Sequence, residues 1–279
     1  MTIISLLKKP FFGRYQKPWR WPPGVDPAAW ERIEIESASG ARLAALHGAS
    51  TGGPARGAIA CVHPMATEAK GYFLRFGQAD ALRRAGYDVL LFDFNGFGES
   101  ADGSFRFPMD ILAAGKVLAA RSGELPIGIY GLSMGAGYAI CACSIDGHPF
   151  RAAFLEAPFT TLDEFWRRSS LFAYAVLRAM SALLPTLMEE LRPIARIAKL
   201  QRLERMLLVY GSEDPFTPPS MGDRLVAACP PSTRTAVWIV PGAKHCQAQR
   251  VAGEEYAKRL VAFFDESFGP ARGSQRSTA

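Results

Sequence analysis

Long apolar runs are missing from this chain of 279 residues. No stretch reaches the roughly 18 charge-poor residues of a membrane-spanning helix, which argues against an integral membrane protein. With 49% hydrophobic and 21% charged residues, the composition also differs from that of disordered or collagen-like proteins. No internal repeat is present. These absences leave a globular chain, and one α/β domain of this length is ordinary.

Paired cysteines are also lacking. The five cysteines are an odd number and lie mostly within apolar stretches, at Cys61, Cys141, Cys143, Cys229 and Cys246. This pattern predicts reduced thiols and a cytoplasmic protein. The C-x-C pair at 141 and 143 has no second cysteine pair or histidine cluster near it, so we predict no metal site.

Acidic residues are absent from the first 25 residues, which contain five of the basic ones. The net charge of +6 therefore comes from the chain ends rather than from a folded basic face, and we expect no nucleic-acid partner. The apolar run here is too short for a signal peptide. We expect residues 1–30 to form an arm packed on the domain surface, with a peripheral membrane contact as the alternative, and neither role bears on the chemistry. Residues 269–279 are predicted to be a disordered tail.

Between the ends, residues 31–268 alternate regularly between strand and helix patterns. Residues 31–37 and 42–47 read as an antiparallel hairpin. Six short apolar runs that predict buried strands follow it, at 57–63, 87–92, 126–130, 152–155, 206–210 and 236–240. Amphipathic segments of helical length lie between them, near 70–85, 108–122, 134–145, 219–228 and 249–267. This alternation predicts a parallel sheet covered on both faces, with reactive groups on loops at the carboxyl ends of the strands.

A G-x-S-x-G sequence, residues 131–135, lies between a predicted strand and a predicted helix. This is the context of a nucleophile elbow, which identifies Ser133 as the candidate nucleophile. The hydroxyl needs a base, and of four histidines His245 lies in the loop after the last strand. Asp214 follows the strand at 206–210 and is the candidate acid, with Glu213 and Asp163 as alternatives. The order Ser133, Asp214, His245 is that of α/β-hydrolases.

An oxyanion hole needs two N–H donors. One should be the N–H of Met134, directly after the nucleophile, and the other should come from the loop after residue 63. Pro64 has no N–H, so Met65 is the candidate for the second donor.

These motifs, together with residues 93–100 (DFNGFGES), resemble the α/β-hydrolase superfamily, and within it the bacterial esterase, lipase and serine-aminopeptidase-like group. The similarity covers about residues 31–268. It implies an eight-stranded, mostly parallel sheet with helices on both faces, a small helical lid, no cofactor, and hydrolysis through an acyl-enzyme. Members usually have His-Gly after the third strand and Arg at position 95, whereas this chain has His63-Pro64 and Asn95.

The substrate is predicted from the helical insertion at about 160–200, where the resemblance places the lid. Its Leu-, Phe- and Met-rich character favours an apolar acyl or alkyl group, with Trp166, Phe172 and Met180 as candidate lining residues, although the same residues could simply pack the lid onto the core. The expected function is hydrolysis of a small-molecule carboxylic ester. A thioesterase or acyltransferase would use the same three residues, a catalytically silent binding protein is the non-enzyme alternative, and a peptidase is less favoured. The sequence does not indicate an oligomeric state.

Overall fold

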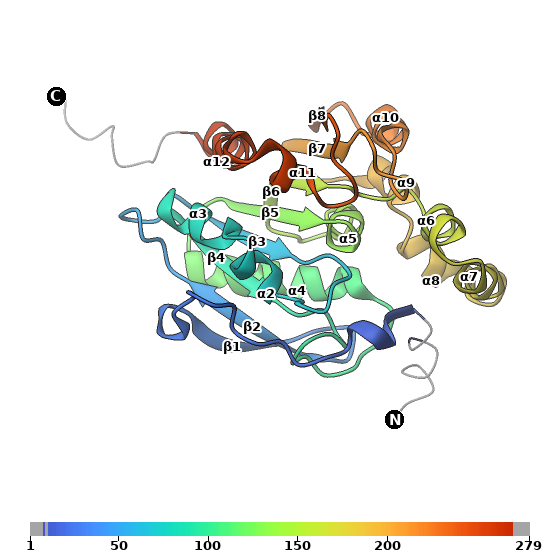
Figure 1. Ribbon diagram of the computed structural model, residues 1–279, viewed down its shortest axis with the longest axis horizontal. Helices are drawn as coiled ribbons and strands as arrows, with labels where there is room; N and C mark the ends of the chain where they lie inside the picture. The colour runs from blue at the N-terminus through green and yellow to red at the C-terminus, as the bar shows by residue number, and fades with distance from the viewer. Residues whose placement is uncertain (1–7, 9–10, 270–279) are drawn as a thin grey trace.

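The computed structural model describes residue 8 and residues 11–269. Among these residues, eight strands form one sheet in the order β1-β2-β4-β3-β5-β6-β7-β8 (Figure 1). The strands are β1 (Glu31–Glu36), β2 (Arg42–Gly48), β3 (Gly57–Val62), β4 (Tyr87–Phe92), β5 (Ile127–Leu132), β6 (Phe150–Glu156), β7 (Arg205–Gly211) and β8 (Arg234–Val240). β2 pairs antiparallel with β1 and β4, and every other pairing is parallel. The predicted α/β-hydrolase sheet is confirmed.

The strand order places a crevice at the carboxyl ends of β3 and β5. The chain passes from β3 to β4 on one side and then crosses to β5 on the other side of β3. Loops that leave neighbouring strands in opposite directions open a gap between them, which is where ligands bind in open α/β sheets. Ser133 directly follows β5, and Met65 follows β3.

Helices cover both faces of the sheet and enclose one apolar core on each. On one face the core includes Ile111, Leu118 and Ile140, and on the other Leu82, Leu260 and Phe264. The helices outside the lid are α2 (Gly71–Arg75), α3 (Gln78–Arg84), α4 (Phe107–Ser122), α5 (Met134–Ala142), α10 (Pro219–Ala228), α11 (Ala248–Ala252) and α12 (Glu254–Phe268). This two-sided covering explains why the central strands are apolar on both faces.

Three sequence predictions about individual elements are wrong in detail. The segments 70–85 and 249–267 each form two helices rather than one, because the chain turns at Gly77 (φ +73°) and Gly253 (φ +56°). These backbone angles lie in a region that glycine adopts readily and that a helix does not use. β8 is not a buried strand, since it lies at the sheet edge and Ile239 is 46% exposed.

The predicted lid is helical and lies beyond the carboxyl ends of the strands (Figure 1). It consists of α6 (Leu162–Ser169), α7 (Leu171–Leu183), α8 (Pro185–Glu190), α9 (Pro193–Arg196) and the 3₁₀ turn η3 (Ile197–Lys199). Side-chain caps start its first two helices, since Thr161 and Ser170 accept hydrogen bonds from the N–H groups of Glu164 and Ala173. Within the described residues, no helix has the length and apolar character needed to cross a bilayer.

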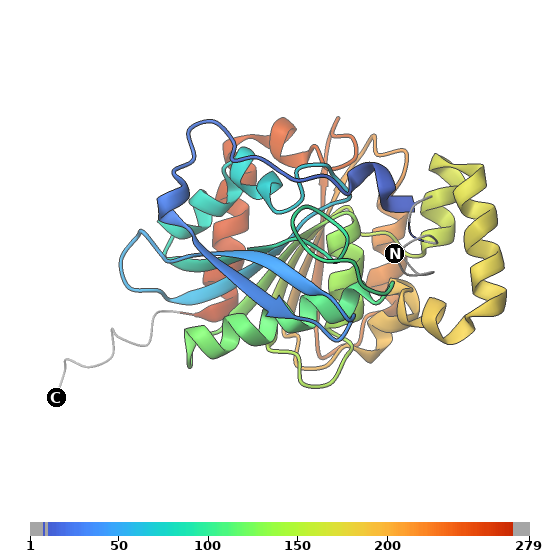
Figure 2. The same ribbon diagram turned by 90° about the horizontal axis from the view of Figure 1, so that it is seen from below.

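The N-terminal arm packs on the domain, beside the lid (Figure 2). It contains the short turns η1 (Gly13–Tyr15) and η2 (Pro27–Ala29), and Phe11 and Phe12 are buried in the same core as α4 and α5. The ring of Phe11 lies 5.6 Å from that of Trp166 in α6, which places arm and lid in direct contact. The tail predicted to be disordered lies outside the described residues except for Gly269.

Candidate active site

Ser133 lies on a sharp turn between β5 and α5. Its backbone angles, φ +49° and ψ −110°, are unusual for a residue with a side chain and are held by hydrogen bonds on both sides. Its N–H donates to the carbonyl of Glu156 at 2.8 Å, and its carbonyl accepts from the N–H of Gly137 at 2.9 Å. A Cβ at Gly135 would lie 2.2 Å from the carbonyl oxygen of Val62, so the turn can pass β3 only with glycine there.

A chain of two short hydrogen bonds connects Ser133, His245 and Asp214. The distance from Ser133 Oγ to His245 Nε2 is 2.7 Å, and the distance from His245 Nδ1 to Asp214 Oδ2 is also 2.7 Å. Because Nδ1 faces a carboxylate, it carries the ring proton, and Nε2 is left to accept the serine hydroxyl proton. The structure therefore brings together the three residues that the sequence nominated.

Asp214 is held in place by the loop that follows it. Its Oδ1 accepts the N–H groups of Phe216 and Thr217 at 2.9 and 3.0 Å, and its Oδ2 accepts the Thr217 hydroxyl at 2.7 Å. Burial raises the pKa of Asp214, but hydrogen bonds from His245 and Thr217 outweigh it and hold the pKa below the usual value. Thr217 is not among the residues predicted from the sequence, although an Asp followed three residues later by Thr is a pattern in which the hydroxyl can reach back to the carboxylate.

The two alternative acids lie apart from the histidine. Asp163 pairs with Arg192 at 3.6 Å between Oδ2 and Nη2, and Glu213 is exposed to solvent. Neither makes a hydrogen bond to His245 among the described contacts, whereas Asp214 does.

The protonation of His245 is set by opposing effects. Burial disfavours its charged form, but the hydrogen-bonded Asp214 carboxylate favours it, and the pKa of His245 is raised above the usual value. An imidazole with a raised pKa is a stronger base and binds its second proton more tightly. This is the electrostatic state expected for a group that must accept a proton from a hydroxyl.

Glu156, at the end of β6, connects the loops of Ser133 and His245, and it is not predicted from the sequence. Its backbone carbonyl accepts the Ser133 N–H, while its buried carboxyl accepts the Ala248 N–H at 3.0 Å and the Tyr256 hydroxyl at 2.6 Å. Burial raises the pKa of this carboxyl. The only signal in the sequence is an acidic residue that ends an apolar strand.

The loop after β3 is fixed by His63, which is fully buried. Its Nε2 accepts the Phe94 N–H at 3.0 Å, so the proton is on Nδ1, which donates to the Pro64 carbonyl at 2.7 Å. Burial lowers the pKa of His63 to about 4, which keeps the ring neutral. Met65 follows and lines the same cavity as Ser133. Met134 is the first residue of α5, so its N–H has no acceptor within the helix.

Comparison with known proteins agrees with this geometry. The family model described as "Serine aminopeptidase, S33" matches residues 53–205, more than half of the chain. The chain belongs to this family. Its members share the α/β-hydrolase fold, so the S33 family assignment also establishes that the chain is related to hydrolases.

Relatives of this S33 family chain include a bacterial protein and a human protein. An uncharacterised protein of Mycobacterium tuberculosis strain H37Rv is 28% identical over 239 residues, which cover 84% of this chain and 79% of that protein. The human Protein ABHD12B is 30% identical over 155 residues, which cover 52% of this chain and 42% of that protein.

Solved structures share the fold over most of the chain. The Pyrococcus furiosus esterase Pf2001 aligns with a TM-score of 0.72 at 19% identity, over 91% of this chain and 98% of that one. A puromycin-hydrolyzing peptidase of Mycobacterium tuberculosis aligns with a TM-score of 0.65 at 18% identity, over 90% of this chain and 42% of that one. At these identities the likeness concerns the fold alone.

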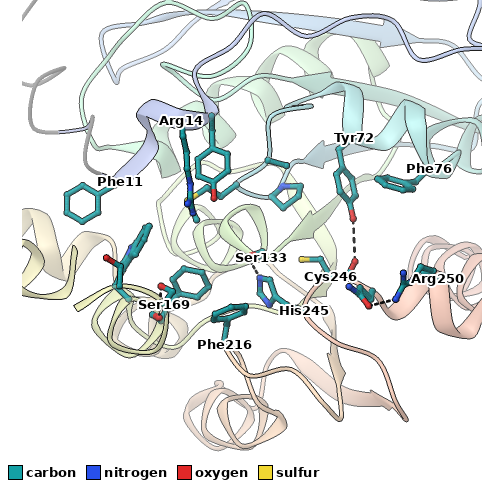
Figure 3. A pocket seen from close by; sticks show the side chains of 18 of the residues that line it. Phe11, Arg14, Tyr72, Phe76, Ser133, Ser169, Phe216, His245, Cys246 and Arg250 are labelled. Atoms are coloured by element: carbon teal, nitrogen blue, oxygen red, sulfur yellow. Dashed lines mark hydrogen bonds between the residues drawn. The ribbon is translucent and has the colours of Figure 1, made fainter. Parts of the chain in front are cut away.

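A cavity of about 910 Å³ opens at Ser133 and His245 in this S33 family chain (Figure 3). The lid contributes Phe165 and Trp166, and the loop after β7 contributes Phe216. The remaining described residues that line it are Phe11, Arg14, Tyr15, Pro64, Met65, Ala66, Tyr72, Phe76, Ser169, Ser170, Cys246, Gln247, Gln249 and Arg250. None of these described residues is Asp or Glu.

No group of three or more His, Cys, Asp or Glu side chains that could hold a metal ion is present among the described residues.

Two of the three predicted lining residues do not line this cavity. Trp166 does, but Phe172 is 68% exposed on the outside of α7, and Met180 is buried with Ala173 and Leu177 beneath that helix. The reason is that α7 runs away from the cavity: its N-cap, Ser170, lines the cavity, but no residue of the helix itself does.

The N-terminal arm, expected to have no bearing on the chemistry, forms part of the cavity wall. Phe11 and Arg14 face Ser133 and His245 across it (Figure 3), and Tyr15 also lines it. Lys8 lies fully buried against Asn95, the position where family members usually carry Arg, and its Nζ is 3.2 Å from the Asn95 carbonyl oxygen. This contact anchors the arm to the domain.

A second anchor holds the arm at Trp19. Its indole N–H donates to Glu99 Oε2 at 2.7 Å, and Glu99 also accepts from Lys70 at 2.6 Å and Arg32 at 3.0 Å. Burial raises the pKa of Glu99, but these hydrogen bonds, Lys70 first, hold it at about 2. The carboxylate therefore stays ionised and keeps the arm bound over the cavity.

Proposed function

We propose that this protein is a serine hydrolase that cleaves carboxylic esters carrying an apolar acyl or alkyl group, through an acyl-enzyme. The observation that carries the proposal is the hydrogen-bonded series Ser133, His245 and Asp214, with both distances at 2.7 Å, beside a cavity of about 910 Å³ that is lined by aromatic and by polar side chains. Nucleophile and base within hydrogen-bond reach, with the base oriented by a carboxylate, are the requirements for an activated serine.

The mechanism follows from the positions of these atoms. His245 Nε2 takes the hydroxyl proton while Ser133 Oγ attacks the ester carbonyl carbon, and Asp214 stabilises the imidazolium that forms. The N–H groups of Met134 and Met65 are the proposed donors to the oxyanion. Collapse of the tetrahedral intermediate expels the alcohol, which receives the proton from Nε2. Water deprotonated by His245 then attacks the acyl-enzyme, releases the acid and restores the serine hydroxyl.

Cavity chemistry favours an ester over a peptide with a free amino end. A substrate ammonium group needs a carboxylate partner, and the described residues that line the cavity include Arg14 and Arg250 but no Asp or Glu. Aromatic side chains from the arm, the lid and the loop after β7 supply apolar contacts instead. Among fold neighbours, one is named an esterase and one a peptidase, so the cavity rather than the fold supports this choice.

Ser133 also borders a second, smaller recess. Phe12, Met134 and Trp166 help line it, and its volume of about 20 Å³ has room for roughly one water-sized group. A scissile ester placed at Ser133 therefore has a confined side and an open side. We propose that the longer apolar group extends into the large cavity.

The test is hydrolysis of p-nitrophenyl esters from acetate to palmitate by the full chain, with Ser133→Ala as the matched control. Amino-acid p-nitroanilides with a free amino group serve as the peptidase comparison. The proposal predicts Ser133-dependent ester turnover with an optimum at some chain length, and little turnover of the anilides. Faster cleavage of the anilides contradicts the ester assignment. Absence of turnover at every chain length redirects the function to a thioester, an acyl acceptor other than water, or binding without catalysis.

A further inference from the structure

The outer face of α7 is apolar although it faces solvent. Leu171, Phe172 and Leu183 are 74%, 68% and 79% exposed, and Leu184 after the helix is 44% exposed. These four account for most of the large hydrophobic side chains that are exposed in the described part of the chain. Large apolar groups gathered in this way on a surface mark an interaction site rather than a random scatter.

Helical geometry places these groups on one side. At 3.6 residues per turn, Phe172 and Leu183, eleven positions apart, project only about 20° apart, and Leu171 lies about 100° to one side of Phe172 on the same exposed half of the helix; Arg178 is the only charged residue in α7. The opposite face is apolar as well, because Ala173, Leu177 and Met180 are buried in the core. A helix that is apolar all round is normally buried, so the outer half of α7 lacks its partner.

The charge around this face has one sign. Between Glu164 and Glu189 the sequence contains no acid but three arginines, Arg167, Arg168 and Arg178. All three are exposed, and in the described part of the chain none forms an ion pair with a carboxylate. Outside the ends of the chain and this segment, acids outnumber bases. The surface is thus apolar in its centre and basic at its edge.

This face borders the mouth of the cavity. Ser169 and Ser170 line the cavity, and the next two residues, Leu171 and Phe172, begin the exposed face. Arg14 of the arm lines the same cavity and is exposed without a carboxylate partner in the described structure. The arm and the lid lie side by side (Figure 2), and residues of both line the cavity. A substrate that leaves a surface bound to α7 would therefore enter the cavity directly.

We infer that the exposed face of α7, with Arg167, Arg168 and Arg178 at its edge, docks on an anionic lipid surface and opens the cavity toward it. The apolar side chains insert between lipid chains at the headgroup boundary, and the arginines contact the anionic headgroups. A second protein copy with the same basic surface would place these arginines against one another, which argues against self-association through this face. The inference goes beyond the proposed function, because docking does not require Ser133.

The test is co-sedimentation of the full chain with vesicles of phosphatidylcholine alone and of equal parts phosphatidylcholine and phosphatidylglycerol. The docking face predicts binding that increases with the anionic lipid and decreases with added salt. Phe172→Ser with Leu183→Ser should weaken binding by about tenfold or more, whereas Ile239→Ser, an exposed apolar residue on β8, should leave it unchanged. Arg167→Gln with Arg168→Gln should remove most of the preference for anionic vesicles, while Arg234→Gln on β8 should not.

Two further readouts separate the explanations. Hydrolysis of a soluble short-chain p-nitrophenyl ester should be the same in the Phe172/Leu183 variant as in the parent, which shows that the variant is folded. Ser133→Ala should still bind vesicles, so loss of catalysis and loss of docking are distinguishable. Equal binding to both vesicle types, or binding to neither, overturns the inference. So does a parent protein that is dimeric in solution, binds no vesicles and becomes monomeric in the Phe172/Leu183 variant.

Discussion

Thr217 offers the sharpest test of how the acid is positioned. Its hydroxyl donates to Asp214 Oδ2 at 2.7 Å and lies 3.2 Å from His245 Nδ1, while its own N–H holds Oδ1 at 3.0 Å. Thr217→Val removes the hydroxyl of a fully buried side chain and keeps its branching at Cβ, so the main change is the loss of the hydrogen bond to Asp214. The carboxylate then loses one of its three loop donors.

The expected effect can be estimated from the strength of that bond. A hydrogen bond to a charged group contributes about 1.5–3 kcal/mol, and the two remaining N–H donors keep the loss near the lower figure. A change of about 1.5 kcal/mol in transition-state stabilisation corresponds to a roughly tenfold fall in kcat. KM should change little, because Thr217 is not among the described residues that line the cavity. Asp214→Asn should be far worse, with a loss on the order of 10⁴-fold.

Steady-state kinetics with the best p-nitrophenyl ester measure this effect, and thermal unfolding of the same samples reports on the fold. Thr217→Ser restores the hydroxyl and should recover most of the parent kcat. An unchanged kcat in Thr217→Val refutes the positioning argument. Equal impairment of the valine and serine variants also refutes it, because the methyl group rather than the hydroxyl would then be the feature that matters.

Three other predictions concern pH, the elbow and the arm. Because His245 acts in its neutral form and its pKa is raised above 6.5, kcat/KM should rise with pH through a midpoint above 6.5, and an acid limb centred at or below that value would contradict the assignment. Gly135→Ala places a Cβ 2.2 Å from the Val62 carbonyl oxygen and should destabilise the protein by about 1–3 kcal/mol in urea unfolding, which an unchanged midpoint would disprove. Trp19→Phe removes a hydrogen bond to Glu99 and should lower stability by about 1 kcal/mol at neutral pH. Since the folded pKa of Glu99 is about 2, below the ordinary 4.5, this difference should be full above 4.5 and shrink as the pH falls toward 2.

The sheet and the three central residues were predictable because their signals are local. Each strand is a short apolar run, and the elbow needs glycine at fixed positions around Ser133. The loops of Asp214 and His245 each follow a strand, and parallel strands place their carboxyl ends at the same end of the sheet. The proximity of the two loops could therefore be predicted from the strand pattern. The roles of Met65 and Met134 as oxyanion donors stay predictions.

Features that depend on distant contacts were not predictable in the same way. Phe172 and Met180 belong to an apolar helix, and only its direction in space shows that neither reaches the cavity. Glu156 gains its importance from Ala248 and Tyr256, about a hundred residues away. The arm carries aromatic and basic residues whose partners cannot be read from their spacing, and Lys8 contacts Asn95 only in the folded chain.

The most direct measurement of the central claim is covalent labelling of the full chain with a fluorophosphonate, followed by mass spectrometry of its peptides. An activated serine should form one adduct at Ser133, absent in Ser133→Ala and formed much more slowly in His245→Ala. The hydrogen-bonded geometry of the site predicts this result. No adduct, or an adduct at another residue at the same rate in all three proteins, would contradict the assignment of Ser133 as the nucleophile.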